Sequence, residues 1–249
     1  MKAIKIFMIM ALSSALAGCS DWLSEDGAPK LTYDYYETKE GVDAAVVSAY
    51  SYLRWGCGGE RFDVLTEMGT DLFIAGSDGN YKASFNMYGT QLNPDLDILD
   101  KMWENHYKGI GTANIGLERI LNSELSESDK KQSYAEMLFI RAFLYFDLVQ
   151  QFGRIPLVTK GSLEVRTDFK RASVEEVYKQ IITDLRECTA NLAPTTKEKG
   201  RATSYAAAHL LAKVYLTRGS AVADKRGQKP TDMDSACLLY TSDAADDLT

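Results

Sequence analysis

The segment 126–149 is the feature that most constrains the fold of this chain. Ser126 followed by Asp129 is typical of a helix start, in which the Ser side chain caps the first turn. Residues 137–149 are then apolar on nearly every side of the expected helix. Such a helix is stable only when other elements cover it, so it must lie at the centre of the fold. Gly153 ends it.

Apolar residues at helical spacing predict four further helices. Their start signals are Thr38, Pro94, Ser173 and Thr203, and the run from Ser173 to Glu176 is a complete capping box. The stripe expected after Pro94 consists of Leu99, Met102, Trp103, Tyr107, Ile110, Asn114, Leu117 and Leu121.

Two segments between the helices lack helical periodicity. Residues 57–93 are rich in Gly, Asp, Asn and Tyr, and we expect a long ordered loop region there. Loops of that length tend to carry function. Residues 155–158 are expected to form a short extended segment after Gly153.

An internal echo favours pairing of the helices. The heptapeptides 140–146 and 210–216 lie 70 residues apart and share Ala and Tyr at the same positions. This offset is close to two tetratricopeptide units of about 34 residues each. A small Ala where helices cross, with a Tyr one turn later, suits close packing. The sequence therefore predicts an all-α fold of tetratricopeptide-like helix pairs with long irregular loops.

The N-terminus has the features of a bacterial export signal. Lys2 and Lys5 precede the apolar run 6–16, which is too short to span a bilayer. Leu-Ala-Gly-Cys follows at 16–19 and resembles the lipobox of bacterial lipoproteins, in which the thiol receives a diacylglycerol. We therefore expect a lipoprotein signal peptide at 1–18, lipidation at Cys19, and a lipidated tether at 19–37. The alternative is an ordinary secretory signal with an incidental Cys.

The C-terminal residues 237–249 do not continue any earlier pattern. They resemble the translation of a sequencing adapter, so we interpret them as a non-native tail; a natural short tail is the alternative. The helical domain is then 38–236, and we expect it to be truncated at its C-terminus.

Composition excludes several classes of protein. The formal net charge of −7 argues against a nucleic-acid binder, which would show a basic face. His106 and His209 lie far apart in the sequence, which disfavours a multi-His metal site or a His-dependent nucleophile. We expect neither a metal nor a cofactor. Cys188 lies on an apolar stripe, and whether it pairs with Cys57 is open.

Several short blocks of the sequence form a recognisable series. The blocks are 19–23, Gly41 to Ala45 with Ala49-Tyr50, Thr70-Asp71, Trp103 with Tyr107 and Asn114, 141–149 with Gly153 and Pro156-Leu157, 200–203, and 212–216. Together they resemble the SusD/RagB family of outer-membrane nutrient-binding lipoproteins of Bacteroidetes. Each block alone is weak, but all of them follow the order of the family from Cys19 to about Ala236.

The resemblance implies a fold and a function. The fold is the SusD-like α-superhelix. Such proteins are anchored on the cell surface of the outer membrane and capture oligosaccharides, or in some members peptides. They deliver the ligand to a SusC-type TonB-dependent transporter, and they are not enzymes. A tetratricopeptide-like scaffold lipoprotein that binds a protein or peptide partner is the alternative. A glycosidase would need a pair of carboxylates across a cleft, and no pair stands out.

Sugar sites combine aromatic faces with planar polar groups. From residues 55–91, in and just before the long loop region, we select Trp55, Asp78, Asn80, Tyr81 and Tyr88 as candidate ligand-binding residues. The alternatives are a simple turn at 78–80 and a packing role for Trp55. We expect Trp103, Tyr107 and Asn114 to be core residues. Arg141 and Arg201 are expected to pair with carboxylates or with carbonyls at helix C-termini, and no residue is assigned a catalytic role.

Overall fold

The computed structural model describes residues 33–56, 59–162, 166–221 and 226–246. The chain divides into two compact units, residues 1–35 and 36–249, and helices α2 to α8 belong to the second. Cys19, the expected signal peptide 1–18 and Cys57 lie outside the described residues. Cys188 is a free, buried thiol.

Helices make up almost all of the regular structure. The isolated antiparallel bridge between Pro156 and Arg171 is the one β-type pairing in the part of the chain that the structure describes. The prediction of an all-α fold is confirmed. The elements are η3 (Tyr33–Glu37), α2 (Lys39–Ser51), η4 (Tyr52–Trp55), α3 (Glu60–Thr66), the π-helical turn η5 (Lys82–Asn86), α4 (Asp97–Asn122), α5 (Glu127–Phe152), α6 (Val174–Asn191), α7 (Ser204–Gly219) and α8 (Asp232–Asp246).

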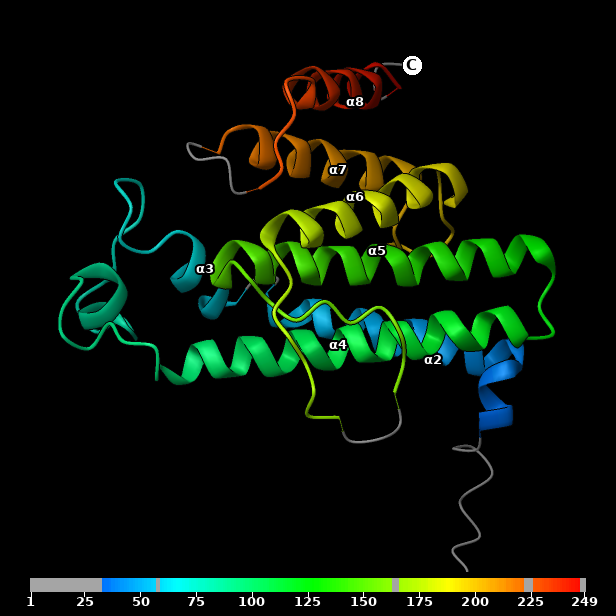
Figure 1. Cartoon of the computed structure of the whole chain (residues 1–249), viewed down its shortest axis with the longest axis horizontal. Coiled ribbons are helices and arrows are strands. Elements are labelled where there is room, and N and C mark those ends of the chain that lie inside the picture. The colour runs from blue at the N-terminus through cyan, green and yellow to red at the C-terminus, as the bar shows by residue number, and fades with distance from the viewer. Residues whose placement is uncertain (1–32, 57–58, 163–165, 222–225, 247–249) are drawn as a thin grey trace, which may run out of the picture. The chain divides into compact units, whose positions relative to one another are not determined.

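The long helices form a stack of antiparallel neighbours (Figure 1). Helix α4 packs on α5, α5 on α6, α6 on α7, and α7 on α8, while α2 lies against both α4 and α5. Each helix contacts mainly the next one in the sequence, as expected for tetratricopeptide-like pairs. None of the helices among the described residues is both long and apolar enough to cross a bilayer.

Four of the five predicted helix starts are confirmed by their caps. The side chains of Thr38, Ser126, Ser173 and Thr203 each accept a hydrogen bond from a backbone N–H in the first turn. The expectation for Pro94 is wrong, because α4 begins three residues later and has no side-chain cap. Two acidic residues in its first turn complement the helix dipole instead.

Small residues decide which face of α4 is buried. Gly109, Ala113 and Gly116 face neighbouring helices, because a side chain at either glycine would collide with Leu144 or Met137 of α5. The expected stripe is therefore wrong at both ends, where Ile98 and Ile120 are buried in place of Leu99 and Leu121. Trp103 and Tyr107 lie at the edge of the buried face and are half-buried.

The predicted central position of α5 is confirmed. Nearly every residue from Met137 to Val149 is buried, and each large apolar side chain there contributes about 1.5–3 kcal/mol to folding. The two positions shared by the internal echo are buried in both copies. They are Ala142 and Ala212, and Tyr145 and Tyr215.

Candidate functional site

A buried ion pair holds the centre of the stack. Arg141 Nε and Nη2 donate to the two carboxylate oxygens of Asp184, each at 2.8 Å, and Nη1 donates to Asn114 Oδ1 at 2.9 Å. Burial works against the charge of Arg141, but Asp184 outweighs it, so the pKa of Arg141 lies above its ordinary value. The expected carboxylate partner of Arg141 is confirmed, and this Arg is fully engaged within the fold.

The same helices hold the extended segment 155–159, which we call the strap (Figure 1). Tyr145 Oη donates to Val158 O at 2.8 Å and accepts from Val158 N at 2.7 Å. Tyr107 Oη donates to Pro156 O at 2.7 Å, and Asn114 Nδ2 donates to Val158 O at 2.8 Å. These side chains make the hydrogen bonds to the strap backbone that a neighbouring β-strand would make in a sheet.

Four of the five predicted ligand-binding residues lie in the loop region between α3 and α4. Asp78 is exposed in a turn. Asn80 Nδ2 donates to Glu60 Oε2 at 3.0 Å, and Tyr81 Oη donates to Asp97 Oδ1 at 2.9 Å. Tyr88 is 65% exposed, and its hydroxyl donates to Gly69 O at 3.0 Å. These contacts tie the loop to the starts of α3 and α4.

Both loop tyrosines adopt a backbone conformation that bulky residues avoid. The φ angle is 57° at Tyr81 and 50° at Tyr88, and these are the only two positive values at residues other than Gly in the described ranges. A bulky residue in the left-handed region costs about 1–3 kcal/mol, and such strain clusters at ligand-binding positions.

The loop region also gathers exposed apolar side chains. Of fourteen large apolar residues that are exposed in the described part of the chain, six lie between 72 and 92. An apolar surface of this kind usually contacts a ligand or a partner. We call these residues, together with Tyr81, the loop surface; they are Leu72, Phe73, Ile74, Met87, Tyr88 and Leu92.

The fifth predicted residue, Trp55, lies apart from the loop surface. It ends η4 and lines a cavity of about 320 Å³ between α3 and the C-terminal part of α5, which we call the Trp55 cavity. None of Asp78, Asn80, Tyr81 and Tyr88 lines this cavity. The complete lining is Trp55, Phe62, Leu65, Thr66, Glu67, Met102, Asp147, Gln150, Gln151 and Lys213.

A second cavity, of about 610 Å³, lies between α4 and the strap. Trp103 and Tyr107 line one side of it, and Phe169 and Arg166 another. Trp103 also packs edge-to-face on Phe152, with ring centroids 5.1 Å apart. The two α4 residues therefore pack against the core, as expected, and also present a surface to this cavity. Asn114 is fully in the core.

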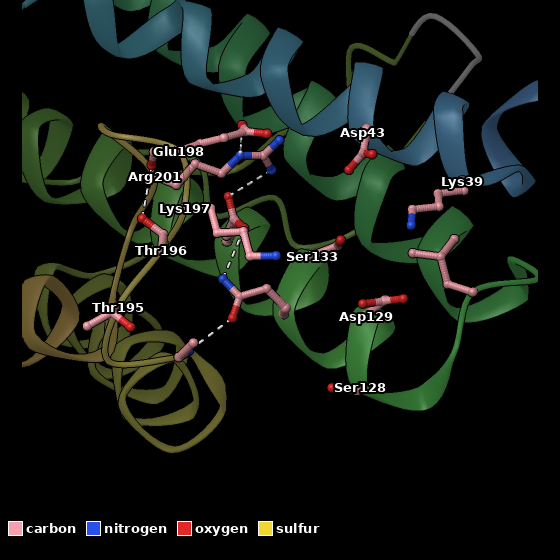
Figure 2. A pocket seen from close by; sticks show the side chains of 14 residues that line it. Lys39, Asp43, Ser128, Asp129, Ser133, Thr195, Thr196, Lys197, Glu198 and Arg201 are labelled. Atoms are coloured by element: carbon pink, nitrogen blue, oxygen red, sulfur yellow. Dashed lines mark hydrogen bonds and ion pairs between the residues drawn. The ribbon is translucent and has the colours of Figure 1, made fainter.

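A third cavity, of about 530 Å³, lies beside the first turns of α5 (Figure 2). Arg201 donates to Glu198 Oε2 at 2.8 Å and to the buried Glu136 at 3.3 Å, so its expected carboxylate partners are confirmed. Gln132 joins Glu136 to Ala193 N. The polar side chains at the floor of this cavity thus hold the connection 193–203 against α5.

Sequence patterns did not single out Asp147, Gln151 or Lys213, which lie around the Trp55 cavity. One signal could have pointed to this cavity: Asp147 is the carboxylate inside the largely apolar run 137–149.

His106 is buried, with only 2% of its surface exposed. No cluster of three or more His, Cys, Asp or Glu able to hold a metal occurs in the described ranges.

Known proteins resemble the chain over most of its length. A family model for SusD-like proteins, described as "Starch-binding associating with outer membrane", matches residues 22–216. SusD-like protein P2 of Formosa agariphila is 30% identical over 230 residues, which cover 88% of this chain and 44% of the relative. A SusD-like protein of Bacteroides ovatus is 30% identical over 223 residues, which cover 86% of this chain and 39% of the relative.

Solved structures share the fold. A laminarin-binding SusD-like protein is 26% identical and has a TM-score of 0.67, over 83% of this chain and 43% of that one. A SusD-like protein of Bacteroides fragilis is 25% identical, with the same TM-score, over 86% of this chain and 39% of that one. The chain thus spans less than half the length of these relatives.

Proposed function

The chain belongs to the SusD-like family of starch-binding proteins that associate with the outer membrane, and on this basis we propose that it is a cell-surface lipoprotein that captures oligosaccharides. It delivers them to a SusC-type TonB-dependent outer-membrane transporter. It binds its ligand and breaks no bond. The observation that carries this proposal is the family match over residues 22–216.

The loop surface supports a ligand-binding role for this end of the molecule. Its apolar residues and Tyr88 are exposed, and Tyr81 is half-buried, although the core of the helix stack is well filled. Tyr88 offers an aromatic face for the C–H groups of a sugar ring, and Asp78 and Asn80 offer planar polar groups for paired hydroxyls. Tyr81 contributes its ring edge and holds the loop to Asp97.

Native gel electrophoresis with a polysaccharide cast into the gel tests this proposal. We expect starch or laminarin in the gel to retard the migration of the protein. The double variant Tyr81→Ala/Tyr88→Ala should migrate freely, while Leu121→Ala, which alters an exposed residue at the end of α4, should be retarded like the wild type. Wild-type protein that is retarded by neither glycan, but captures a peptide, would favour the scaffold alternative.

The anchor is proposed to be a diacylglycerol on Cys19, in line with the lipobox. One acyl chain binds a membrane only marginally, whereas several give stable attachment without a spanning helix. The wild-type protein expressed in a Bacteroidetes host should partition into the detergent phase with the outer membrane. Cys19→Ala should move to the aqueous phase and should no longer co-purify with the transporter. Equal partitioning of the two proteins would refute lipidation at this residue.

A further inference from the structure

The Trp55 cavity combines groups that the loop surface does not explain. Its volume of about 320 Å³ is near the lower end of the range for small-molecule sites, about 300–1,000 Å³. Its walls come from α3, η4, the C-terminal part of α5, and single residues of α4 and α7. Figure 1 shows α3 beside this end of α5. All but one of these elements pack firmly in the helix stack, so the cavity has rigid walls on most sides.

Asp147 is the key polar group of this cavity. Its side chain is only 13% exposed, and Oδ2 lies 3.3 Å from His106 Nε2. His106 is held in turn by Met102 O, which lies 2.8 Å from Nδ1. Because a carbonyl oxygen can only accept, Nδ1 carries a proton and donates it there. The carboxylate thus lies in contact with a His that is itself held in place.

The second oxygen of this carboxylate is available to a ligand. Asp147 Oδ1 has no hydrogen-bond partner in the part of the chain that the structure describes, and Asp147 lines the cavity. No buried side-chain oxygen in that part of the chain lacks a partner, so Oδ1 is open to solvent. A carboxylate oxygen that is open to solvent in the wall of a cavity can accept a hydrogen bond from a ligand hydroxyl.

Trp55 supplies the apolar side of the cavity. Its ring meets the His106 ring edge-to-face, with centroids 5.6 Å apart at 82°, so the indole packs on the same His that contacts Asp147. Two amides stand at the rim. Gln151 Nε2 donates to Leu65 O at 2.9 Å and Gln150 Nε2 to Phe146 O at 3.1 Å, which leaves each Oε1 as an acceptor. Lys213 adds a donor.

We propose that the Trp55 cavity binds one pyranose ring, as a site separate from the loop surface. The ring stacks its C–H face on Trp55, and adjacent hydroxyls donate to Asp147 Oδ1 and Gln151 Oε1. Lys213 donates to a ring or hydroxyl oxygen. An apolar face with oriented acceptors opposite it matches the two-sided character of a sugar ring. The proposal rests on the proposed function only for the class of ligand.

The probes are methyl glycosides, which are too small to span both sites. Methyl β-D-glucopyranoside, galactopyranoside and xylopyranoside are each titrated into the protein and followed by saturation-transfer NMR. We expect one of them to bind in the millimolar range. Trp55→Ala should weaken binding roughly tenfold or more, as loss of an aromatic stacking contact predicts. Asp147→Ala should weaken it by a similar factor, because the variant has no side-chain acceptor at this position.

Asp147→Ala also removes the contact with His106, so a second pair of variants tests whether the loss of binding comes from misfolding. Gln151→Ala and Lys213→Met change exposed side chains on helix surfaces, and each should weaken binding a few-fold with an unchanged circular dichroism spectrum. Leu121→Ala, at an exposed position outside both the loop surface and the cavity lining, is the matched control and should bind the monosaccharide glycoside like the wild type.

The outcomes separate this site from the proposed function. No saturation transfer from any of the three glycosides at 50 mM (about ten times a dissociation constant of 5 mM) would overturn the cavity site. So would equal binding by the wild type, Trp55→Ala and Gln151→Ala. In either case, retardation by starch or laminarin that depends on Tyr81 and Tyr88 would leave the capture function standing. Glycoside binding without any retardation by polysaccharide would support the cavity site and count against the loop surface.

Discussion

Arg141 and Asp184 join the two central helices, α5 and α6, through two parallel hydrogen bonds of 2.8 Å. Their side chains are 6% and 3% exposed, so the pair is removed from water. A bidentate pair of this kind fixes both the separation and the rotation of the helices, because the guanidinium plane must match the carboxylate plane.

Removal of one partner should be costly. Asp184→Asn leaves the charge of Arg141 buried without compensation, and we expect the free energy of unfolding to fall by about 3–5 kcal/mol. Arg166→Gln, which breaks an exposed ion pair with Asp168, should change it by less than about 1 kcal/mol. Urea unfolding followed by circular dichroism measures both. Similar values for the two variants would contradict a structural role for the buried pair.

Two glycines of α4 should respond to alanine with opposite signs. A methyl group on Gly109 would lie 2.5 Å from Leu144 Cδ1 and 2.9 Å from Tyr52 Cβ, whereas one on Gly111 has no neighbour within 4 Å. Gly111→Ala should stabilise the protein by about 1 kcal/mol through helix propensity. Gly109→Ala should destabilise it by about 1–2 kcal/mol, since the collision of the new methyl group with Leu144 and Tyr52 outweighs the gain in helix propensity. Thermal unfolding of the two variants decides this; stabilisation by both would show that α4 and α5 can separate at little cost.

Because the backbone at Tyr88 is strained, replacing this residue by Gly should preserve stability but abolish glycan binding. Gly adopts a φ of 50° freely, so Tyr88→Gly should keep or raise the thermal midpoint although it removes a side chain. The same variant should lose retardation by glycan. The neighbouring Met87 is equally exposed but has a φ of −98°, so Met87→Gly should cost about 0.5–1 kcal/mol. If Tyr88→Gly is the more destabilised of the two, the strain is not real.

Acid should weaken the contact between Arg218 and Asp232. Burial alone would raise the pKa of Asp232, but hydrogen bonds from Arg218 and from Lys229 N outweigh it, so the pKa lies below its ordinary value. A depressed carboxylate pKa stabilises the folded state above the unfolded pKa of about 3.9, and this stabilisation is lost as the pH falls further.

Asp232→Asn should therefore be less stable than the wild type by about 2 kcal/mol at pH 7, with the difference shrinking towards pH 2.5. Asp234→Asn, in the same first turn but exposed, should show no such trend. Urea unfolding across this pH range gives the comparison. A difference that stays constant down to pH 2.5 would mean that the charge of Asp232 is not what stabilises the contact.

Local signals predicted much of the fold, and contacts distant in sequence account for the rest. Caps such as Ser173 and the apolar run 137–149 act within a few residues, and both are confirmed. The face of α4 depended on Gly109 and Gly116, which carry no hydrophobic signal and matter only because α5 lies against them. The short helix α3 within the expected loop could not be read from its seven residues.

The candidate site was predictable only in composition. The loop between α3 and α4 was singled out for its Tyr, Asp and Asn residues, but nothing in the sequence separated Trp55 from that loop. The cavity beside Trp55 is lined by Asp147 of α5, which meets His106 of α4, 41 residues away in the sequence. Such a contact depends on how two helices pack together. The periodicity of a sequence predicts the buried face of each helix, but not which residues of two helices meet. The boundary at residue 237 stays a prediction, since α8 extends on both sides of it.

The strap has a consequence for how proteins of this architecture diversify. Its backbone is held at Pro156 by Tyr107 and at Val158 by Asn114 and Tyr145, and Ala172 N donates to Ile155 O. The chain that leaves Val158 and returns at Arg171 can therefore change length without moving α5 or α6. Each doubling of such a loop costs only about 0.6 kcal/mol. Insertions there can add new surface to the protein while the helices stay unchanged, at little cost in folding free energy.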